Sequence, residues 1–221
     1  VMDTFDAFCP AVVIHAGASK HVGLAEVQPL ECIDVNVHGS QAVARAAIRH
    51  GCRVVLGIST DKAAAPAMTT YGISKALMER CFASLDGTAG VRFSLVRLGN
   101  LAWSPGSVFP AWREMQRRGE TIRTTGPEMR RFFMSVSAAV DIIERQITEI
   151  DSLSGKIFVP KLKVAQISDV LDVWTTRFGG AWEPVARRKG DFDDQWMFGP
   201  SEGPYATEFA LGGHDGIALD L

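Results

Sequence analysis

Two pairs of residues in the stretch 59–75, STDKAAAPAMTTYGISK, have the types needed for proton transfer. Tyr71 and Lys75 are four residues apart, so on a helix their side chains share one face. A phenol beside an ammonium can shuttle protons, because the positive charge stabilises the phenolate and lowers the pKa of the phenol from about 10. The same lysine can hold the ribose hydroxyls of a nicotinamide cofactor. The Y-x-x-x-K pattern alone is weak, since by chance it also occurs as an ordinary pair on a helix surface.

Thr60, Asp61 and Lys62 precede this pair and offer an alcohol, a carboxylic acid and an amine. Without their neighbours, Asp61 and Lys62 are better explained as a loop-start aspartate and a solvated lysine. Beside Tyr71 and Lys75, however, they could supply an acid and a base to a second chemical step. Both interpretations stay open at the level of residue type and spacing.

The sequence pattern around these residues predicts that a parallel α/β sheet positions them. Apolar runs bounded by turn residues are typical of buried parallel strands, and they alternate with segments of helical periodicity. Such alternation indicates right-handed βαβ units with helices on both faces of the sheet. Thr60 would then end a strand, and open α/β sheets bind ligands at the carboxyl ends of their strands. The predicted strands cover 11–19, 52–60 and 91–100, and the predicted helices cover 29–51 and 70–85.

After Asn100 the sequence mixes Pro, Gly and aromatic residues with shorter elements. The patterns predict helices over 111–118, 137–147 and 166–178 and a strand over 156–160. From Gly179 onward they indicate only short strands or loops. The joint between the first strand and the first helix lacks a G-x-G-x-x-G turn, which normally holds the pyrophosphate of a dinucleotide. We therefore expect the N-terminal phosphate-binding half of such a fold to be absent.

The composition is that of a globular protein: among 221 residues, 47% are hydrophobic and 22% charged, with a net charge of −2. This balance gives no basic excess for nucleic acid, and no segment reads as a membrane span or a signal peptide. The four cysteines are far apart and lack metal-ligand spacing, which favours a reducing compartment and no metal site. We expect a soluble cytoplasmic protein.

Four segments resemble one family in their order and spacing: HAGASKHVGLAEVQPLECIDVNVHGSQAVARAAI, VVLGISTDKAAAPAMTTYGISK, VRLGNLAWSPGSVFPAWREM and GPEMRRFFMSV. They are similar to the nucleotide-sugar 4,6-dehydratases of bacterial polysaccharide biosynthesis, which are extended short-chain dehydrogenase/reductases. The type most similar is the inverting UDP-N-acetylglucosamine 4,6-dehydratase. The resemblance implies a doubly wound parallel Rossmann-type sheet with a small α+β substrate-binding lobe. Residues 1–102 would be the C-terminal part of the NAD(P)-binding domain, and 103–221 a substrate-binding region interleaved with the last sheet elements.

The resemblance also implies catalytic roles. Tyr71 would take the proton from the sugar O4 while hydride leaves C4, Lys75 would lower the Tyr71 pKa and hold the nicotinamide ribose, and Thr60 would hydrogen-bond O4. The resulting 4-ketone acidifies the C5–H bond. Lys62 would then be the base at C5 and Asp61 the acid that protonates the departing 6-hydroxyl. Return of hydride to C6 and reprotonation on the opposite face would invert C5, so the cofactor is regenerated in each turnover.

Further binding residues are implied by position within the family motifs. The cofactor would lie along Ala16, Gly17, Ala18, Lys20 and Asn36, together with Tyr71 and Lys75. The UDP-sugar would contact His21, Asn100, Ser107, Val108 and Arg131, although His21 is equally well explained as a histidine with no ligand. Arg130 is an alternative to Arg131 as the partner of the diphosphate. Arg187, Arg188 and Asp191 loosely match a later family stretch that contacts substrate phosphate.

Three functions remain to be distinguished. The first is an NADP-dependent dehydratase acting on UDP-N-acetylglucosamine, with NAD as the other cofactor. The second is a nucleotide-sugar epimerase of the same superfamily, which would have no role for Lys62. The third is a truncated, non-catalytic domain that binds a nucleotide sugar. Because the strand at 11–19 would present an apolar edge, we also expect a homo-oligomer.

Overall fold

The computed structural model describes residues 1–187 and 190–221, so Arg188 lies outside the described residues. The chain divides into two compact units, each described here by itself. The sheet unit comprises Val1–Leu98, Asp141–Lys161 and Trp196–Leu221. The smaller unit comprises Gly99–Val140 and Leu162–Gln195. Neither unit is a single continuous stretch of chain, so residues distant in sequence build each of them.

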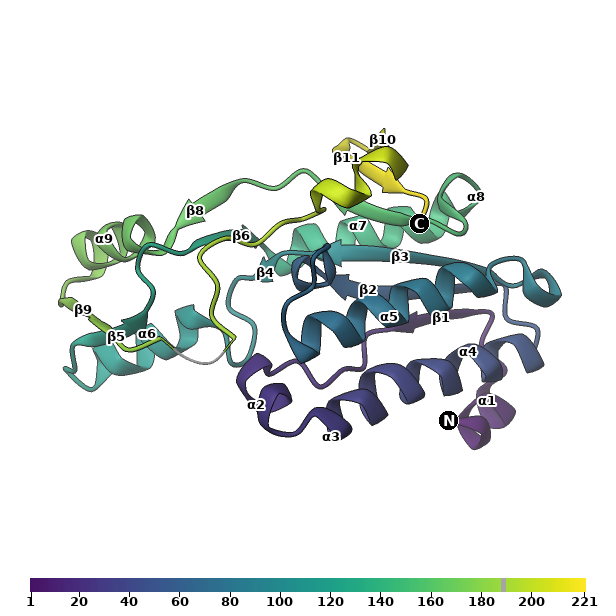
Figure 1. The fold of residues 1–221 in the computed structure, drawn as a ribbon, viewed down its shortest axis with the longest axis horizontal. Coiled ribbons are helices and arrows are strands. Elements are labelled where there is room, and N and C mark those ends of the chain that lie inside the picture. The colour runs from purple at the N-terminus through teal and green to yellow at the C-terminus, as the bar shows by residue number, and fades with distance from the viewer. Residues whose placement is uncertain (188–189) are drawn as a thin grey trace. The chain divides into compact units, whose positions relative to one another are not determined.

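A six-stranded sheet with the order β1-β2-β3-β7-β11-β10 forms the centre of the sheet unit (Figure 1). The first four strands are parallel, and the β10–β11 hairpin is antiparallel to β7. The strands are β1 (Val12–His15), β2 (Val54–Thr60), β3 (Arg92–Leu98), β7 (Ile157–Pro160), β10 (Ala206–Leu211) and β11 (His214–Leu219). The residues of β2 and β7 are almost all buried, as expected for strands covered on both faces. The predicted Rossmann-type α/β class is confirmed, and β1 lies at one edge of the sheet.

Helices cover both faces of this sheet. Phe93 on β3 packs edge-to-face against Phe82 of α5, with ring centroids 5.4 Å apart. The next residue, Ser94, points to the other face, where it accepts a hydrogen bond of 2.6 Å from Gln146 of α7. Side chains alternate along a strand, so α5 and α7 lie on opposite faces. The helices around this sheet are α1 (Met2–Phe8), α2 (Val22–Val27), α3 (Pro29–Ile33), α4 (Gly39–Arg49), α5 (Thr70–Leu85), α7 (Val136–Thr148, which begins in the smaller unit) and α8 (Ile150–Leu153).

The helix predicted over 29–51 is interrupted. A π-helical turn, η1 (Asp34–His38), separates α3 from α4 and contains the buried Asn36. Single π turns inside helices often occur at functional sites. Helical periodicity is nearly unchanged by one wider turn, so the sequence pattern could not reveal it.

The smaller unit contains short strands and two helices around an aromatic core. Its buried cluster consists of Trp112, Ile122, Met129, Ile167, Leu171 and Trp174. Its elements are β4 (Asn100–Leu101), α6 (Val108–Arg117), β5 (Ile122–Thr125), β6 (Arg130–Met134), β8 (Val164–Gln166), α9 (Ile167–Phe178) and β9 (Trp182–Val185). Within the part of the chain that the structure describes, no helix is both long and apolar enough to cross a membrane.

Candidate active site

A chain of hydrogen bonds begins where β2 ends. Thr60 Oγ1 donates to Asp61 Oδ1 at 2.9 Å, and Lys62 Nζ donates to the same oxygen at 2.9 Å. Asp61 is 2% exposed, whereas the Lys62 side chain is 20% exposed. The other carboxylate oxygen, Asp61 Oδ2, is buried and has no hydrogen-bond partner among the described residues. A buried acceptor without a partner is costly, so Oδ2 is a candidate to meet a ligand or to carry a proton.

Tyr71 joins this chain at the N-terminus of α5. Its hydroxyl is hydrogen-bonded to Thr60, and its ring is buried. Burial raises the Tyr71 pKa to about 12; the hydrogen bond with Thr60 lowers it, and the charge of Asp61 raises it further. The phenol is therefore neutral at physiological pH and can donate or relay a proton, but it is not a standing phenolate.

Lys75 is bonded to the sheet in this structure, and its expected effect on the Tyr71 pKa stays a prediction. Its ammonium donates to the carbonyl oxygen of Ile58 at 2.6 Å and to Met78 Sδ at 3.1 Å. It is 2% exposed, and burial lowers the Lys75 pKa to about 8, with the Glu79 carboxylate opposing that shift. Sharing a helix face places the two residues near each other, and these two hydrogen bonds of the Lys75 ammonium go to the sheet backbone and to Met78.

Close backbone contact fixes the loop against α5. Thr69 caps the helix by accepting a hydrogen bond of 3.0 Å from the Gly72 amide. Gly72 lies so near the loop that any added Cβ would collide with the Lys62 carbonyl oxygen. Only glycine permits this close approach. Because Tyr71 is next to Gly72, the contact places the backbone of Tyr71 beside that of Lys62.

The predicted cofactor loop follows β1 and is held by Asn36. The Asn36 side chain accepts from the Ser19 amide at 2.7 Å and donates to the Ser19 carbonyl at 3.1 Å. It also donates to Ser74 Oγ on α5 at 2.9 Å. The amide group of Asn36 positions the loop, and the predicted contact of Asn36 with the cofactor stays a prediction. Of the other predicted loop residues, Ala16, Gly17, Lys20 and His21 are exposed and Ala18 is half-buried.

A buried histidine extends the same network. Ser40 gives its only proton to the Asn36 carbonyl at 2.6 Å, so His15 Nε2, at 2.8 Å from Ser40 Oγ, must be the donor. Burial, assisted by the charge of Lys75, lowers the His15 pKa to about 4. His15 is therefore neutral at physiological pH and serves to hold η1.

The smaller unit holds the remaining predicted substrate residues. Asn100 donates its side-chain amide to the Phe132 carbonyl at 3.0 Å. Ser107 occupies the N-cap of α6, yet its buried Oγ has no partner among the described residues. Val108, the first residue of α6, is 36% exposed. Ser107 thus has a buried hydroxyl without a partner among the described residues, whereas the Asn100 amide is already bonded.

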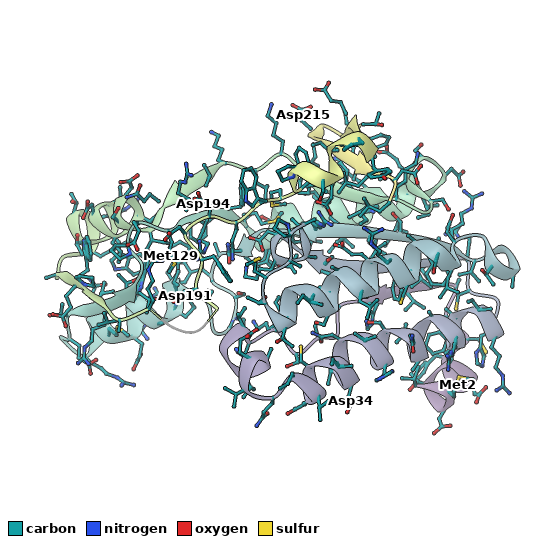
Figure 2. The ribbon with its side chains drawn as sticks, in the orientation of Figure 1. Met2, Asp34, Met129, Asp191, Asp194 and Asp215 are labelled. Carbon is teal, nitrogen blue, oxygen red and sulfur yellow. The ribbon has the colours of Figure 1, made fainter. Side chains whose placement is uncertain are left out.

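Arg131 is held by backbone oxygens of a distant segment. Its guanidinium donates to the carbonyls of Phe192 at 2.8 Å and Asp193 at 3.1 Å, and to Met129 Sδ at 2.9 Å. Arg130 instead makes a two-pronged ion pair with Asp194, at 2.6 and 2.7 Å. Figure 2 labels Met129 and Asp194 on the two segments that these bonds join. The adjacent arginines thus differ in these hydrogen bonds: Arg131 donates to backbone carbonyls, whereas Arg130 pairs with a carboxylate.

Arg187 and Asp191 match the later family stretch only loosely. Arg187 forms ion pairs with Glu128 and, at 2.5 Å, with Asp193. Both acidic partners would compete with phosphate for this guanidinium.

Sequence reasoning missed the residues that hold the site in place through hydrogen bonds and ion pairs: His15, Ser19, Ser74, Glu79, Arg97 and Glu202. One signal was present, because Arg97 is a charge inside the apolar strand FSLVRLGN and a charge there needs a buried partner. The identity of that partner could not be read from spacing, since Glu202 lies 105 residues further along the chain.

Comparison with known proteins identifies the family. The family described as polysaccharide biosynthesis protein matches residues 1–186. The UDP-N-acetylglucosamine 4,6-dehydratase (inverting) of Campylobacter jejuni is 35% identical over 162 residues, which cover 72% of this chain and 48% of that protein. The UDP-glucose 4-epimerase of Rickettsia typhi is 32% identical over 213 residues, covering 94% of this chain and 61% of that protein. The chain thus spans about half the length of the dehydratase relative.

Solved structures agree with the fold. The X-ray structure of Pen from Bacillus thuringiensis superposes with a TM-score of 0.90 at 25% identity, covering 99% of this chain and 68% of that one. DesIV, a dTDP-glucose 4,6-dehydratase from Streptomyces venezuelae solved with NAD and TYD bound, gives a TM-score of 0.82 at 17% identity, covering 97% and 72%. With its dehydratase-type motifs, its parallel sheet and a family match over most of its length, this chain belongs to the polysaccharide biosynthesis protein family.

Proposed function

We propose that this protein is a nucleotide-sugar 4,6-dehydratase acting on UDP-N-acetylglucosamine in bacterial glycan biosynthesis. One observation carries the proposal: Tyr71, Thr60, Asp61 and Lys62 form one hydrogen-bonded chain, and its central carboxylate keeps a buried oxygen without a partner. Oxidation at C4 needs only the Tyr71 end of that chain. The Asp61–Lys62 end is what a second, water-eliminating step requires.

The fit to a nicotinamide cofactor rests on the loop after β1. Ala16, Gly17 and Ala18 have small side chains, and a Cβ added at Gly17 would meet nothing closer than His15 at 3.8 Å. Such a loop lets a flat ring or a ribose approach the backbone. A bound cofactor, which we propose to be NADP, would accept hydride from C4 and return it to C6. Lys75, buried at the base of the site, would hold the nicotinamide ribose.

The protein's own groups would move the protons of the first step. As a phenolate, formed when its pKa falls and its proton leaves to solvent, Tyr71 would accept the proton of the 4-hydroxyl, while Thr60 would hydrogen-bond O4. The Tyr71 pKa of about 12 must fall for this transfer, and a cationic nicotinamide is the kind of charge that lowers it.

In the second step, the Asp61–Lys62 pair supplies both an acid and a base. Moving one proton along their 2.9 Å hydrogen bond converts the ammonium and carboxylate into an amine and a carboxylic acid. Lys62 could then take the C5 proton while Asp61 gives its proton to the departing 6-hydroxyl, so water leaves and the pair regains its charges. Proton and charge balance of the elimination therefore close within two adjacent residues. Reprotonation at C5 on the opposite face, by a solvent proton equivalent to the one taken from O4 in the first step, would give the inverted product.

Residues of the smaller unit are proposed to bind the nucleotide. Ser107 Oγ is a hydroxyl without a partner among the described residues, and Arg131 offers a planar fork suited to a diphosphate. His21, Asn100 and Val108 remain proposed contacts of the sugar nucleotide. Homo-oligomer formation also remains a prediction.

A C4 epimerase is the second candidate, favoured by the epimerase relative that covers 94% of this chain. An epimerase would use Tyr71 and Lys75 and leave Lys62 without a task. The third candidate, a non-catalytic binding domain, would bind UDP-sugar without turnover.

Product analysis in D2O separates the three functions. The protein is incubated with UDP-N-acetylglucosamine and NADP+ or NAD+, and the sugar is followed by NMR. We expect a 6-deoxy-4-keto sugar with deuterium at C5, and we expect Lys62→Ala to lose both the product and the C5 label. A C4 epimer that persists in Lys62→Ala indicates the epimerase. If calorimetry shows that the UDP-sugar binds but no product forms, the protein is the non-catalytic binding domain. Lys156→Ala, just before β7 and so at the amino ends of the parallel strands, is the matched control.

A further inference from the structure

A buried ionic network lies beside the catalytic loop. Arg97 on β3 is 1% exposed and contacts Glu79 on α5 and Glu202 in the C-terminal segment. We call these three residues the Arg97 network. All three belong to the sheet unit, and none is among the residues proposed to touch substrate or cofactor.

Every N–H of the Arg97 guanidinium is used. Nε and Nη2 donate to Glu79 at 2.9 and 2.8 Å, and Nη2 and Nη1 donate to Glu202 at 2.7 and 2.9 Å. The fifth N–H meets the Met197 carbonyl at 3.2 Å. A guanidinium has five donors, so no part of this one is left for a ligand. The network therefore has a structural purpose.

Two carboxylates around one guanidinium leave an excess negative charge that other donors must stabilise. Ser59, next to Thr60, donates to Glu79 Oε1 at 2.5 Å. The Gly199 amide donates to Glu202 Oε2 at 2.7 Å, and the Ala65 amide also hydrogen-bonds Glu202. Both ends of the segment that carries Asp61 and Lys62 are thus bonded to the network.

The C-terminal segment lies in direct backbone contact with that loop. A Cβ added at Gly199 would overlap the Ala65 carbonyl oxygen. The short helix η4 (Pro200–Tyr205) begins there and places Glu202 beneath the loop. The loop itself has only one turn of 3-10 helix, η2 (Asp61–Ala63), to hold its shape. Its conformation therefore depends on contacts from outside.

We propose that Glu202 is a positioning residue that fixes the loop 61–66, and with it the Asp61–Lys62 pair, through the Ala65 amide and Arg97. The catalytic part of this inference rests on the proposed function. Elimination of water across C5–C6 requires Asp61 and Lys62 to be placed together, and small misplacements of catalytic groups are costly. Oxidation at C4 depends on Tyr71, which is anchored on α5, so the two steps should respond differently when the loop loosens.

Hydrogen–deuterium exchange tests the positioning without any need for turnover. In Glu202→Gln we expect the amides of 61–65 to exchange roughly tenfold or more faster, because a charged acceptor is lost, while amides in the middle of β2 keep their protection. Glu208→Gln makes the same chemical change at an exposed site on β10 and should leave the loop unchanged. Unchanged loop exchange in Glu202→Gln, or equally faster exchange across the whole sheet unit, overturns the proposal.

Gly199→Ala provides a second route if Glu202→Gln does not fold. It keeps every charge but pushes the segment away from Ala65, so the same local rise in exchange is expected. A folded Gly199→Ala protein with a wild-type loop also overturns the proposal.

Kinetics test the catalytic consequence. We expect Glu202→Gln to lower kcat for the 6-deoxy product roughly 10- to 100-fold with KM for UDP-N-acetylglucosamine unchanged, and C4 oxidation to be spared. A faster-exchanging loop with a wild-type kcat overturns the catalytic role. If the wild-type protein makes no product at all, the proposed function fails, whereas the exchange result still decides whether Glu202 holds the loop.

Discussion

Polar side chains are held differently in the two units. In the sheet unit, Asp61, Lys75 and Arg97 are almost fully buried, and each has a hydrogen-bond partner on a neighbouring element. In the smaller unit, Arg130 and Arg187 make ion pairs in which both partners are substantially exposed. Groups that must act at a fixed geometry are buried and bonded in advance. The ion pairs of Arg130 and Arg187 lie at the surface, where water screens them.

The largest expected effect compares an arginine from each unit. Arg97→Ala leaves two carboxylates buried without their cation, which should reduce the free energy of unfolding by about 3–5 kcal/mol. Arg130→Ala removes an exposed pair and should leave stability within the error of measurement. Urea denaturation of both variants checks this difference. Equal losses in the two variants would show that burial does not distinguish the units.

Acid sensitivity should reside in the sheet unit. The folded-state His15 pKa of about 4 lies below the ordinary 6.5, so between these pH values the unfolded chain binds the extra proton. Stability should therefore fall as pH drops from 6.5 toward 4 and then level off, by about 2–4 kcal/mol in total from this group. His15→Gln should remove that part of the acid slope in denaturation curves recorded across this range. An identical slope in the variant would contradict the assigned burial.

The smallest effect is expected at Ser107 in the smaller unit. Its hydroxyl has no partner among the described residues, so Ser107→Ala should leave thermal stability unchanged. If the hydroxyl binds the sugar nucleotide, the variant should raise KM for UDP-N-acetylglucosamine by roughly 5- to 10-fold, the worth of one hydrogen bond. Ser84→Ala, at an exposed position on α5, is the control. A lower stability with unchanged KM would make Ser107 a structural residue.

Much of the sheet unit could be predicted from sequence because its strands are apolar runs and its helices are periodic. The segments 52–60, 70–85 and 91–100 correspond to β2, α5 and β3. The β10–β11 hairpin could not be placed, because its pairing with β7 joins segments more than fifty residues apart. Local patterns carry no information about which distant strand is the partner.

The sequence indicated which residues form the candidate site, but it could not indicate all of their hydrogen-bond partners. The motif spacing identified Thr60, Asp61, Lys62, Tyr71 and Lys75, and the hydrogen bonds join the first four of them. Lys75 differs because its ammonium binds a sheet carbonyl, which no spacing along α5 could show. The Arg97 network was missed for the same reason as the hairpin.

A single-turnover experiment with two variants tests most directly whether the buried chain carries two separable steps. Tyr71→Phe and Lys62→Ala are each mixed with substrate and cofactor in D2O, and the sugar is examined by NMR. We expect Tyr71→Phe to leave the sugar unoxidised, slowed by roughly a thousandfold or more. Lys62→Ala should accumulate a 4-keto sugar that keeps its 6-hydroxyl and its C5 proton. Formation of the 6-deoxy product by Lys62→Ala at the wild-type rate would contradict the assignment of the second step to the Asp61–Lys62 pair.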